Sequence, residues 1–163
     1  MPIIPSERND EAVRALLDGE IVAIPTDTVY GLAASLDHPA AVLRLAELKG
    51  RDPDQPIAVL IDSAEAVAEQ LDDPAALDRV ARHWPGALTA IVRMRDGDAW
   101  PPLVLGAAAD GSKTVGLRAP DDGCAGGRWL AGPLPNATLD ATLDGPLPNA
   151  TLPTLPTGLC GSA

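Results

Sequence analysis

The sequence predicts an α/β fold with a single core domain, in which helices pack on a sheet. Three observations predict it. Strand-like and helix-like segments alternate along the chain as far as about Asp122. The run PIAVLI at residues 56–61 is apolar throughout, which is typical of a strand covered on both faces. With 163 residues, 46% of them hydrophobic, the chain is long enough for one substantial core and short for two.

The first expected elements are a helix and a strand. Ser6 or Asn9 can cap the helix, and Gly19 is placed to end it. A strand follows at residues 21–24, and the polar residues 26–30 are expected to form a loop between this strand and the next helix. The apolar positions expected on one face of the first helix are Val13, Leu16 and Leu17.

The second expected helix occupies residues 37–50 and precedes the apolar strand at residues 56–61. Pro39 falls in its first turn, where a proline is tolerated, and Gly50 lies just beyond its end. Residues 63–71 and 72–84 are also helical in composition. The apolar positions available for burial in the second helix are Val42, Leu45, Ala46 and Leu48.

Asp73 is a suitable cap for the helix expected at residues 72–84, with Pro74 as its first helical residue, and the sequence WPG at residues 84–86 stops this helix. Two further strands complete the expected sheet. The strands are expected at residues 87–95 and 113–119, on either side of a loop at residues 96–112. Ligands of such a sheet gather where strands end.

The composition changes after Asp122. The sequence GPLPNATL occurs twice, at Gly132–Leu139 and Gly145–Leu152, in a segment rich in Pro, Gly and Thr. This segment has no helical period. We therefore divide the chain into a core at residues 1–122 and an irregular, extended or partly disordered tail at residues 123–163.

The charge and the cysteine content exclude several kinds of site. A net charge of −11 and a pI of about 4.4 disfavour a surface that binds nucleic acid by neutralising phosphates. No set of residues has metal-ligand spacing, and Cys124 and Cys160 lack a recognisable base. There is no apolar run of membrane-spanning length and no signal-peptide pattern. These features lead us to expect a cytoplasmic protein without a membrane segment.

Lys49 and Arg51 are the first candidate functional residues, because they stand at a helix end just before a buried strand in a chain poor in cations. They could clamp phosphates, with lysine as a compact charge and arginine as a planar fork. The structural alternative is equally open: they could offset the negative end of the helix dipole and pair with nearby carboxylates.

Candidates also occur near the later strands. Trp84 is best explained as a packing anchor, and His83 as a helix-end residue rather than a catalytic base. Thr89, expected inside the next strand, could point either way. Arg118 ends an apolar strand before Pro120, where a cation can face a cleft, although a surface salt bridge is the plain alternative.

Four of these stretches together resemble one family, the YrdC/TsaC family of L-threonylcarbamoyladenylate synthases. The similar stretches are PTDTVYGLAA at Pro25–Ala34, KGR followed by DQPIAVLI, WPGALT and TVGLRAPD. They occur in the family's order and spacing and span Val22–Asp121. Four ordered motifs are far more specific than any one of them.

The resemblance implies a twisted open sheet with a large concave cleft. It implies a reaction that joins L-threonine, bicarbonate and ATP into L-threonylcarbamoyladenylate and releases pyrophosphate, with Mg²⁺ accompanying the ATP. The product would serve N6-threonylcarbamoyladenosine modification of tRNA, through a separate threonylcarbamoyltransferase complex. Binding of tRNA or double-stranded RNA by members of the family would be weak and strongly salt-dependent in so acidic a chain.

The same resemblance assigns roles to individual residues. Lys49 and Arg51 would clamp the triphosphate, and Arg118 would bind the threonine carboxylate or a phosphate. The remaining substrate-binding residues that it implies are Thr28 and Tyr30 in the first motif, Gln55 beside the nucleotide, and Thr89 facing ATP. It implies no metal ligand from the protein.

The chain departs from the family after the last motif. Family members continue into a Ser-x-Asn motif that contacts substrate, and this tripeptide pattern is absent from the sequence. The leading hypothesis is therefore a synthase, impaired if that motif is indispensable. The alternative is a non-catalytic nucleotide- or RNA-binding module. A carbamoyl-transfer domain like that of hydrogenase-maturation proteins is disfavoured, because the chain lacks the acylphosphatase-like and zinc-finger regions of those proteins.

Overall fold

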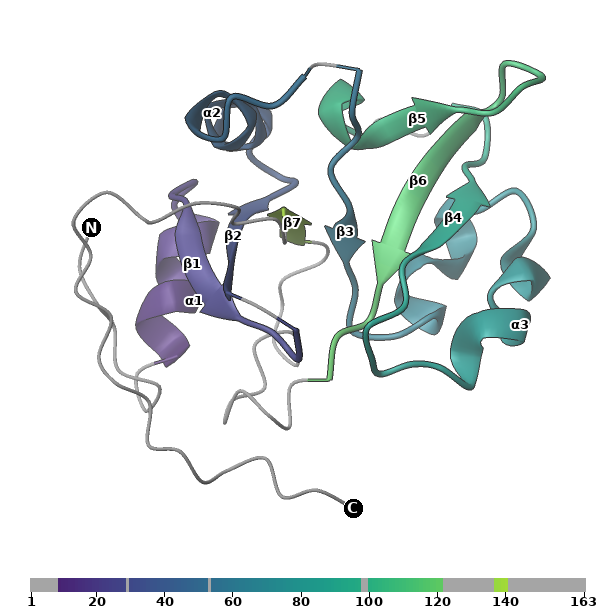
Figure 1. Ribbon diagram of the computed structural model, residues 1–163, viewed down its shortest axis with the longest axis horizontal. Helices are drawn as coiled ribbons and strands as arrows, with labels where there is room; N and C mark the ends of the chain where they lie inside the picture. The colour runs from purple at the N-terminus through teal and green to yellow at the C-terminus, as the bar shows by residue number, and fades with distance from the viewer. Residues whose placement is uncertain (1–8, 29, 53, 98–99, 122–136, 141–163) are drawn as a thin grey trace.

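The computed structural model describes residues 9–28, 30–52, 54–97, 100–121 and 137–140. Within these ranges the chain forms one mixed sheet of seven strands, with helices packed beside it (Figure 1). The α-helices and strands in chain order are α1 (Asn9–Leu17), β1 (Val22–Pro25), β2 (Tyr30–Ser35), α2 (Pro39–Leu48), β3 (Val59–Leu60), α3 (Asp78–Ala81), β4 (Ala90–Arg93), β5 (Leu105–Ala107), β6 (Lys113–Arg118) and β7 (Ala137–Asp140).

The strands lie in the order β1-β2-β7-β3-β6-β4, and β5 pairs with the first half of β6. Of the pairings in the described part of the chain, only that of β3 with β6 is parallel, with Val59 opposite Leu117 and Leu60 opposite Arg118. The expected α/β class with an open sheet is confirmed. The sheet is nevertheless mostly antiparallel, since five of its six described pairings run antiparallel, although only β1–β2 and β5–β6 join strands consecutive in the chain.

The core forms on the helix faces that the apolar pattern indicates, with two exceptions. In α2 the residues Ala41, Val42, Leu45 and Ala46 are buried, and in α1 the buried residues are Ala12 and Leu16. Leu17 and Leu48, both expected to be buried, are 43% and 66% exposed. At 100° per residue each lies roughly 90–120° from the centre of its buried stripe.

The helix ends follow the sequence, whereas the third and fourth expected helices are shorter. Gly19 and Gly50 have φ of 76° and 58°, the left-handed conformation that ends a helix and favours glycine. Asp73 caps as expected, since its Oδ1 accepts a hydrogen bond from the Ala75 N–H. Between residues 63 and 84 the described helical pieces are short turns of 3-10 helix at Glu65–Gln70 and Pro74–Ala76, followed by α3.

Two expected loops contain strands. The stretch after β1 turns back as β2 and forms an antiparallel hairpin, with Val22 opposite Ala33. Apart from Tyr30 and Leu32, the residues of β2, YGLAAS, are glycine, alanine and serine, which carry little strand preference, so pairing on both sides makes the strand. Likewise β5 lies in the expected loop at residues 96–112 and forms through pairing with β6.

Strand β7 lies in the middle of the sheet, antiparallel to both β2 and β3 (Figure 1). It comes from the first GPLPNATL copy and is the part of residues 123–163 that the structure describes. An extended conformation there agrees with the sequence. The second copy, Cys124 and Cys160 lie outside the described residues, and the boundary at residue 122 stays a prediction.

The exposed and buried leucines of α2 provide a matched test of this packing. Leu45→Ala removes a fully buried side chain and should lower the free energy of unfolding by about 2–5 kcal/mol. Leu48→Ala, on the same helix, should change it by no more than about 0.5 kcal/mol. Urea denaturation followed by circular dichroism measures both. Equal losses of unfolding free energy in the two variants would contradict the orientation of α2.

Candidate functional site

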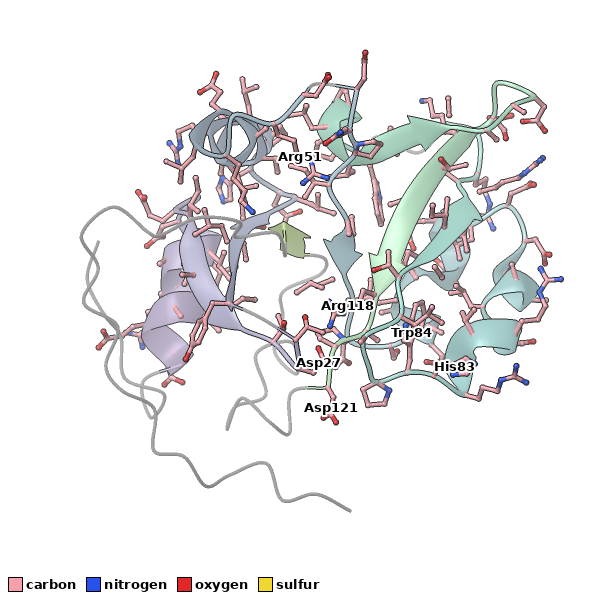
Figure 2. All side chains as sticks on the ribbon, viewed as in Figure 1. Asp27, Arg51, His83, Trp84, Arg118 and Asp121 are labelled. Atoms are coloured by element: carbon pink, nitrogen blue, oxygen red, sulfur yellow. The ribbon has the colours of Figure 1, made fainter. Side chains whose placement is uncertain are left out.

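Arg118, the last residue of β6, is the most enclosed charged side chain in the described part of the molecule. It is 6% exposed and lies where the parallel strands β3 and β6 end. Its guanidinium donates hydrogen bonds to three groups: Asp27 Oδ1 at 2.5 Å, Thr28 Oγ1 at 3.2 Å and the Gly86 carbonyl at 3.3 Å. Figure 2 shows the Arg118 and Asp27 side chains directed toward each other.

Asp27 and Thr28 belong to the turn between β1 and β2. The Thr26 and Thr28 hydroxyl oxygens lie 3.1 Å apart, and the Thr28 N–H donates to Thr26 Oγ1 at 3.3 Å. These local bonds fix the turn, as hydroxyl side chains commonly do. The turn thereby holds the Asp27 carboxylate and the Thr28 hydroxyl against Arg118.

Gly86 belongs to the junction between α3 and β4. Its N–H donates to the Ala119 carbonyl at 2.8 Å, so the junction bonds to residues 118 and 119 from both sides. A Cβ at this position would lie 2.7 Å from the His83 carbonyl oxygen, so the close backbone approach requires glycine. Trp84 packs partly buried against the main core cluster, and its indole N–H donates to the Leu88 carbonyl. The expected anchoring role is therefore confirmed, although aliphatic side chains fill the centre.

Arg118 thus brings together three of the four sequence motifs: the turn after β1, the WPG junction and the end of β6. The Arg118 and Asp27 side chains are 7% and 11% exposed, so their opposite charges are only slightly screened by water. The exposed Arg93–Asp110 pair, at 54% and 51%, provides the contrast. We name the group of Asp27, Thr28, Gly86 and Arg118 the Arg118 cluster.

The fourth motif, KGR at residues 49–51 with the stretch that follows it, lies away from the Arg118 cluster. Lys49 and Arg51 stand in the segment between α2 and β3, whereas Arg118 lies beyond the end of the paired strands (Figure 2). Arg51 Nε and Nη2 donate to the carbonyls of Gln55 and Pro56, at 3.0 and 3.1 Å. The structure therefore places the two expected binding regions at opposite ends of β3, and Arg51 also stabilises the loop that follows it.

The remaining candidates are exposed. Tyr30 begins β2, and the Gln55 side chain faces solvent. Thr89 directly precedes β4, so its expected position inside that strand is wrong; strand pairing starts at Ala90. Its methyl carbon lies 3.4 Å from the point that a Cβ of Gly116 would occupy. His83 is exposed after α3, where Arg82 Nε donates to its Nε2. The roles of these side chains stay predictions.

Asp27 is the residue that the sequence reasoning missed. The one signal for it was indirect: a buried arginine requires a carboxylate or several carbonyl acceptors, and Asp27 stands in the middle of the most polar motif.

Two carboxyl groups with lowered pKa values lie outside this cluster. Hydrogen bonds from Ser112, with a smaller effect of Arg93, lower the pKa of Asp110. Bonds from its own backbone and from Ser63 lower the pKa of Glu65. Both residues are exposed at the surface, so neither marks a site.

Comparison with known proteins identifies the family. The model of the Sua5/YciO/YrdC family, which carries the description "Telomere recombination", matches residues 14–126. The chain belongs to the Sua5/YciO/YrdC family. A protein named threonylcarbamoyl-AMP synthase from Bacillus subtilis is 38% identical over 113 residues, which are 68% of this chain and 31% of that protein.

Solved structures of the Sua5/YciO/YrdC family share the fold. Pyrococcus abyssi Sua5 complexed with L-threonine superposes with a TM-score of 0.66 at 27% identity, covering 85% of this chain and 39% of that one. The solution structure of MTH1692 from Methanobacterium thermoautotrophicum gives 0.64 at 30% identity, covering 89% and 67%. The chain thus spans about a third of both the Bacillus protein and the Pyrococcus protein.

The ion pair of the Arg118 cluster should contribute to stability. Arg118→Met leaves the Asp27 carboxylate enclosed without its partner and should lower the free energy of unfolding by about 3 kcal/mol. Arg93→Met, which breaks the exposed pair with Asp110, should cost less than about 1 kcal/mol. Urea denaturation at neutral pH measures both.

The double variant Asp27→Asn/Arg118→Met separates the pair from other effects. It removes the unpaired charge, so its loss should be smaller than that of Arg118→Met alone. A loss of unfolding free energy equal to the sum of the losses in Asp27→Asn and in Arg118→Met would show that the two charges do not interact.

Proposed function

We propose that this chain synthesises L-threonylcarbamoyladenylate from L-threonine, bicarbonate and ATP, as a nucleotidyltransferase acting in tRNA N6-threonylcarbamoyladenosine modification. The observation that carries the proposal is the Arg118 cluster, an enclosed guanidinium beside the Thr28 hydroxyl at the end of paired strands. Similarity to proteins named threonylcarbamoyl-AMP synthase, and to a Sua5 structure complexed with L-threonine, supports it.

The reaction needs positioning and charge more than a protein nucleophile. The amino group of threonine condenses with bicarbonate to form a carbamate and water, and a carbamate oxygen then attacks the α-phosphorus of ATP while pyrophosphate leaves. Arg118 and Thr28 would hold threonine, and Lys49 and Arg51 would hold the triphosphate. Tyr30, Gln55 and Thr89 would contact the substrates around them. The downstream transferase complex and the cytoplasmic location stay predictions.

Mg²⁺ would accompany ATP, and we expect substrate oxygens and water to hold most of it, since Mg²⁺ keeps several waters and commonly binds through phosphates. Among the described residues, no group of three or more His, Cys, Asp or Glu side chains could hold a metal ion. As for membrane segments, none of the described helices has the length and apolar character of a membrane span.

Pyrophosphate release tests the proposed function directly. The purified chain with ATP and Mg²⁺ should release pyrophosphate only when both L-threonine and bicarbonate are present. Release that needs neither would indicate another ATPase activity. ATP binding without release would favour the alternative, a non-catalytic nucleotide-binding module.

The phosphate clamp has its own test. Lys49→Ala and Arg51→Ala should each lower kcat/KM for ATP at least about tenfold, because a charge-assisted hydrogen bond contributes roughly 1.5–3 kcal/mol. Arg79→Ala, which removes an exposed cation of α3, serves as the control and should leave kcat/KM unchanged. Unchanged ATP kinetics in both clamp variants would return Lys49 and Arg51 to structural roles at the end of α2.

A further inference from the structure

The Arg118 cluster contains a carboxylate, which a site for an anion alone does not need. Asp27 Oδ1 lies 2.5 Å from Arg118 Nη2, so the negative charge stands directly beside the positive one. Asp121 adds a second, half-buried carboxylate three residues after Arg118. The charge of the guanidinium is therefore already balanced before any substrate enters.

The ion pair leaves one hydrogen-bonding atom unused on each side. The bonds of Arg118 use Nε and Nη2, and the bond of Asp27 uses Oδ1. Within the described ranges, neither Arg118 Nη1 nor Asp27 Oδ2 has a hydrogen-bond partner. The pair thus offers a donor and an acceptor side by side.

This arrangement discriminates between the two ligands that Arg118 could bind. A triphosphate carries several negative charges, and the Asp27 carboxylate would repel it. An α-amino acid carries a carboxylate and an amino group on one carbon and has no net charge. Its two groups match the donor and the acceptor of the pair.

We propose that Asp27 recognises the α-amino group of the substrate. Its Oδ2 accepts a hydrogen bond from that group, while Arg118 Nη1 donates to the substrate carboxylate. The inference rests on the proposed function and deepens it. Arg118 holds threonine, and Lys49 and Arg51 hold the phosphates, as in the proposed function; the role of Asp27 is what the inference adds.

Analogues of threonine test the assignment without altering the protein. Isothermal titration of the full chain would compare L-threonine with 3-hydroxybutyrate, which lacks the amino group, and with threoninol, which lacks the carboxylate. We expect both analogues to bind at least about tenfold more weakly than L-threonine. Binding of 3-hydroxybutyrate as tight as that of L-threonine would overturn the proposal.

The variant Asp27→Asn then tests whether Asp27 is the source of the preference for ligands with an amino group. The amide keeps the shape and an oxygen that can accept from Arg118, but it loses the charge. We expect it to weaken the binding of L-threonine about tenfold, to leave that of 3-hydroxybutyrate equal or stronger, because Arg118 loses its neutralising charge, and to leave ATP binding unchanged. Asp110→Asn, the same exchange at an exposed carboxylate that pairs with Arg93, is the matched control and should retain both the affinity for L-threonine and the preference for the amino group. Circular dichroism verifies that both variants fold.

Two results would show that Asp27 does not recognise the amino group. One is an unchanged affinity for L-threonine in Asp27→Asn, and the other is an equal loss for L-threonine and 3-hydroxybutyrate, which would mean that Asp27 only holds Arg118. If the preference is absent but threonine-dependent pyrophosphate release persists, the synthase stands without this assignment. If the preference is present without release, the assignment stands without the synthase.

Discussion

The guanidinium of Arg118 is the group on which the arrangement of the candidate site depends. An arginine enclosed to this degree is costly unless acceptors surround it. Here the acceptors come from the turn after β1, from the junction before β4 and from no nearby residue of β6 itself. Satisfying one cation therefore fixes the relative position of segments that lie 32 and 91 residues from it in sequence.

The distribution of cations bears on how so acidic a chain would hold the anionic substrate that we propose for it. With a net charge of −11, its overall field repels polyanions, so local charge must provide the attraction. Arg118 contributes little to such attraction because Asp27 neutralises it. Lys49 and Arg51 lie in a segment that also contains Asp52 and Asp54, both exposed to solvent.

The sequence was informative where structure depends on local pattern. The buried residues Val42 and Leu45, the cap at Asp73 and the position of Arg118 at a strand end all follow from spacing or capping chemistry. Strand β2 could not be predicted in this way, because its small residues become a strand only between two partners. The contact of Asp27 with Arg118 was equally hidden, since nothing in either segment specifies which carboxylate folds onto which cation.

The central position of β7 has a consequence for how the molecule forms. Its neighbours β2 and β3 are complete by residue 60, but the strand between them ends at Asp140. During synthesis, the backbone groups along the facing edges of β2 and β3 therefore stay unpaired until about eighty further residues have been added to the chain. The last described strand of the chain closes the sheet, so the two halves become one sheet only when translation has passed it.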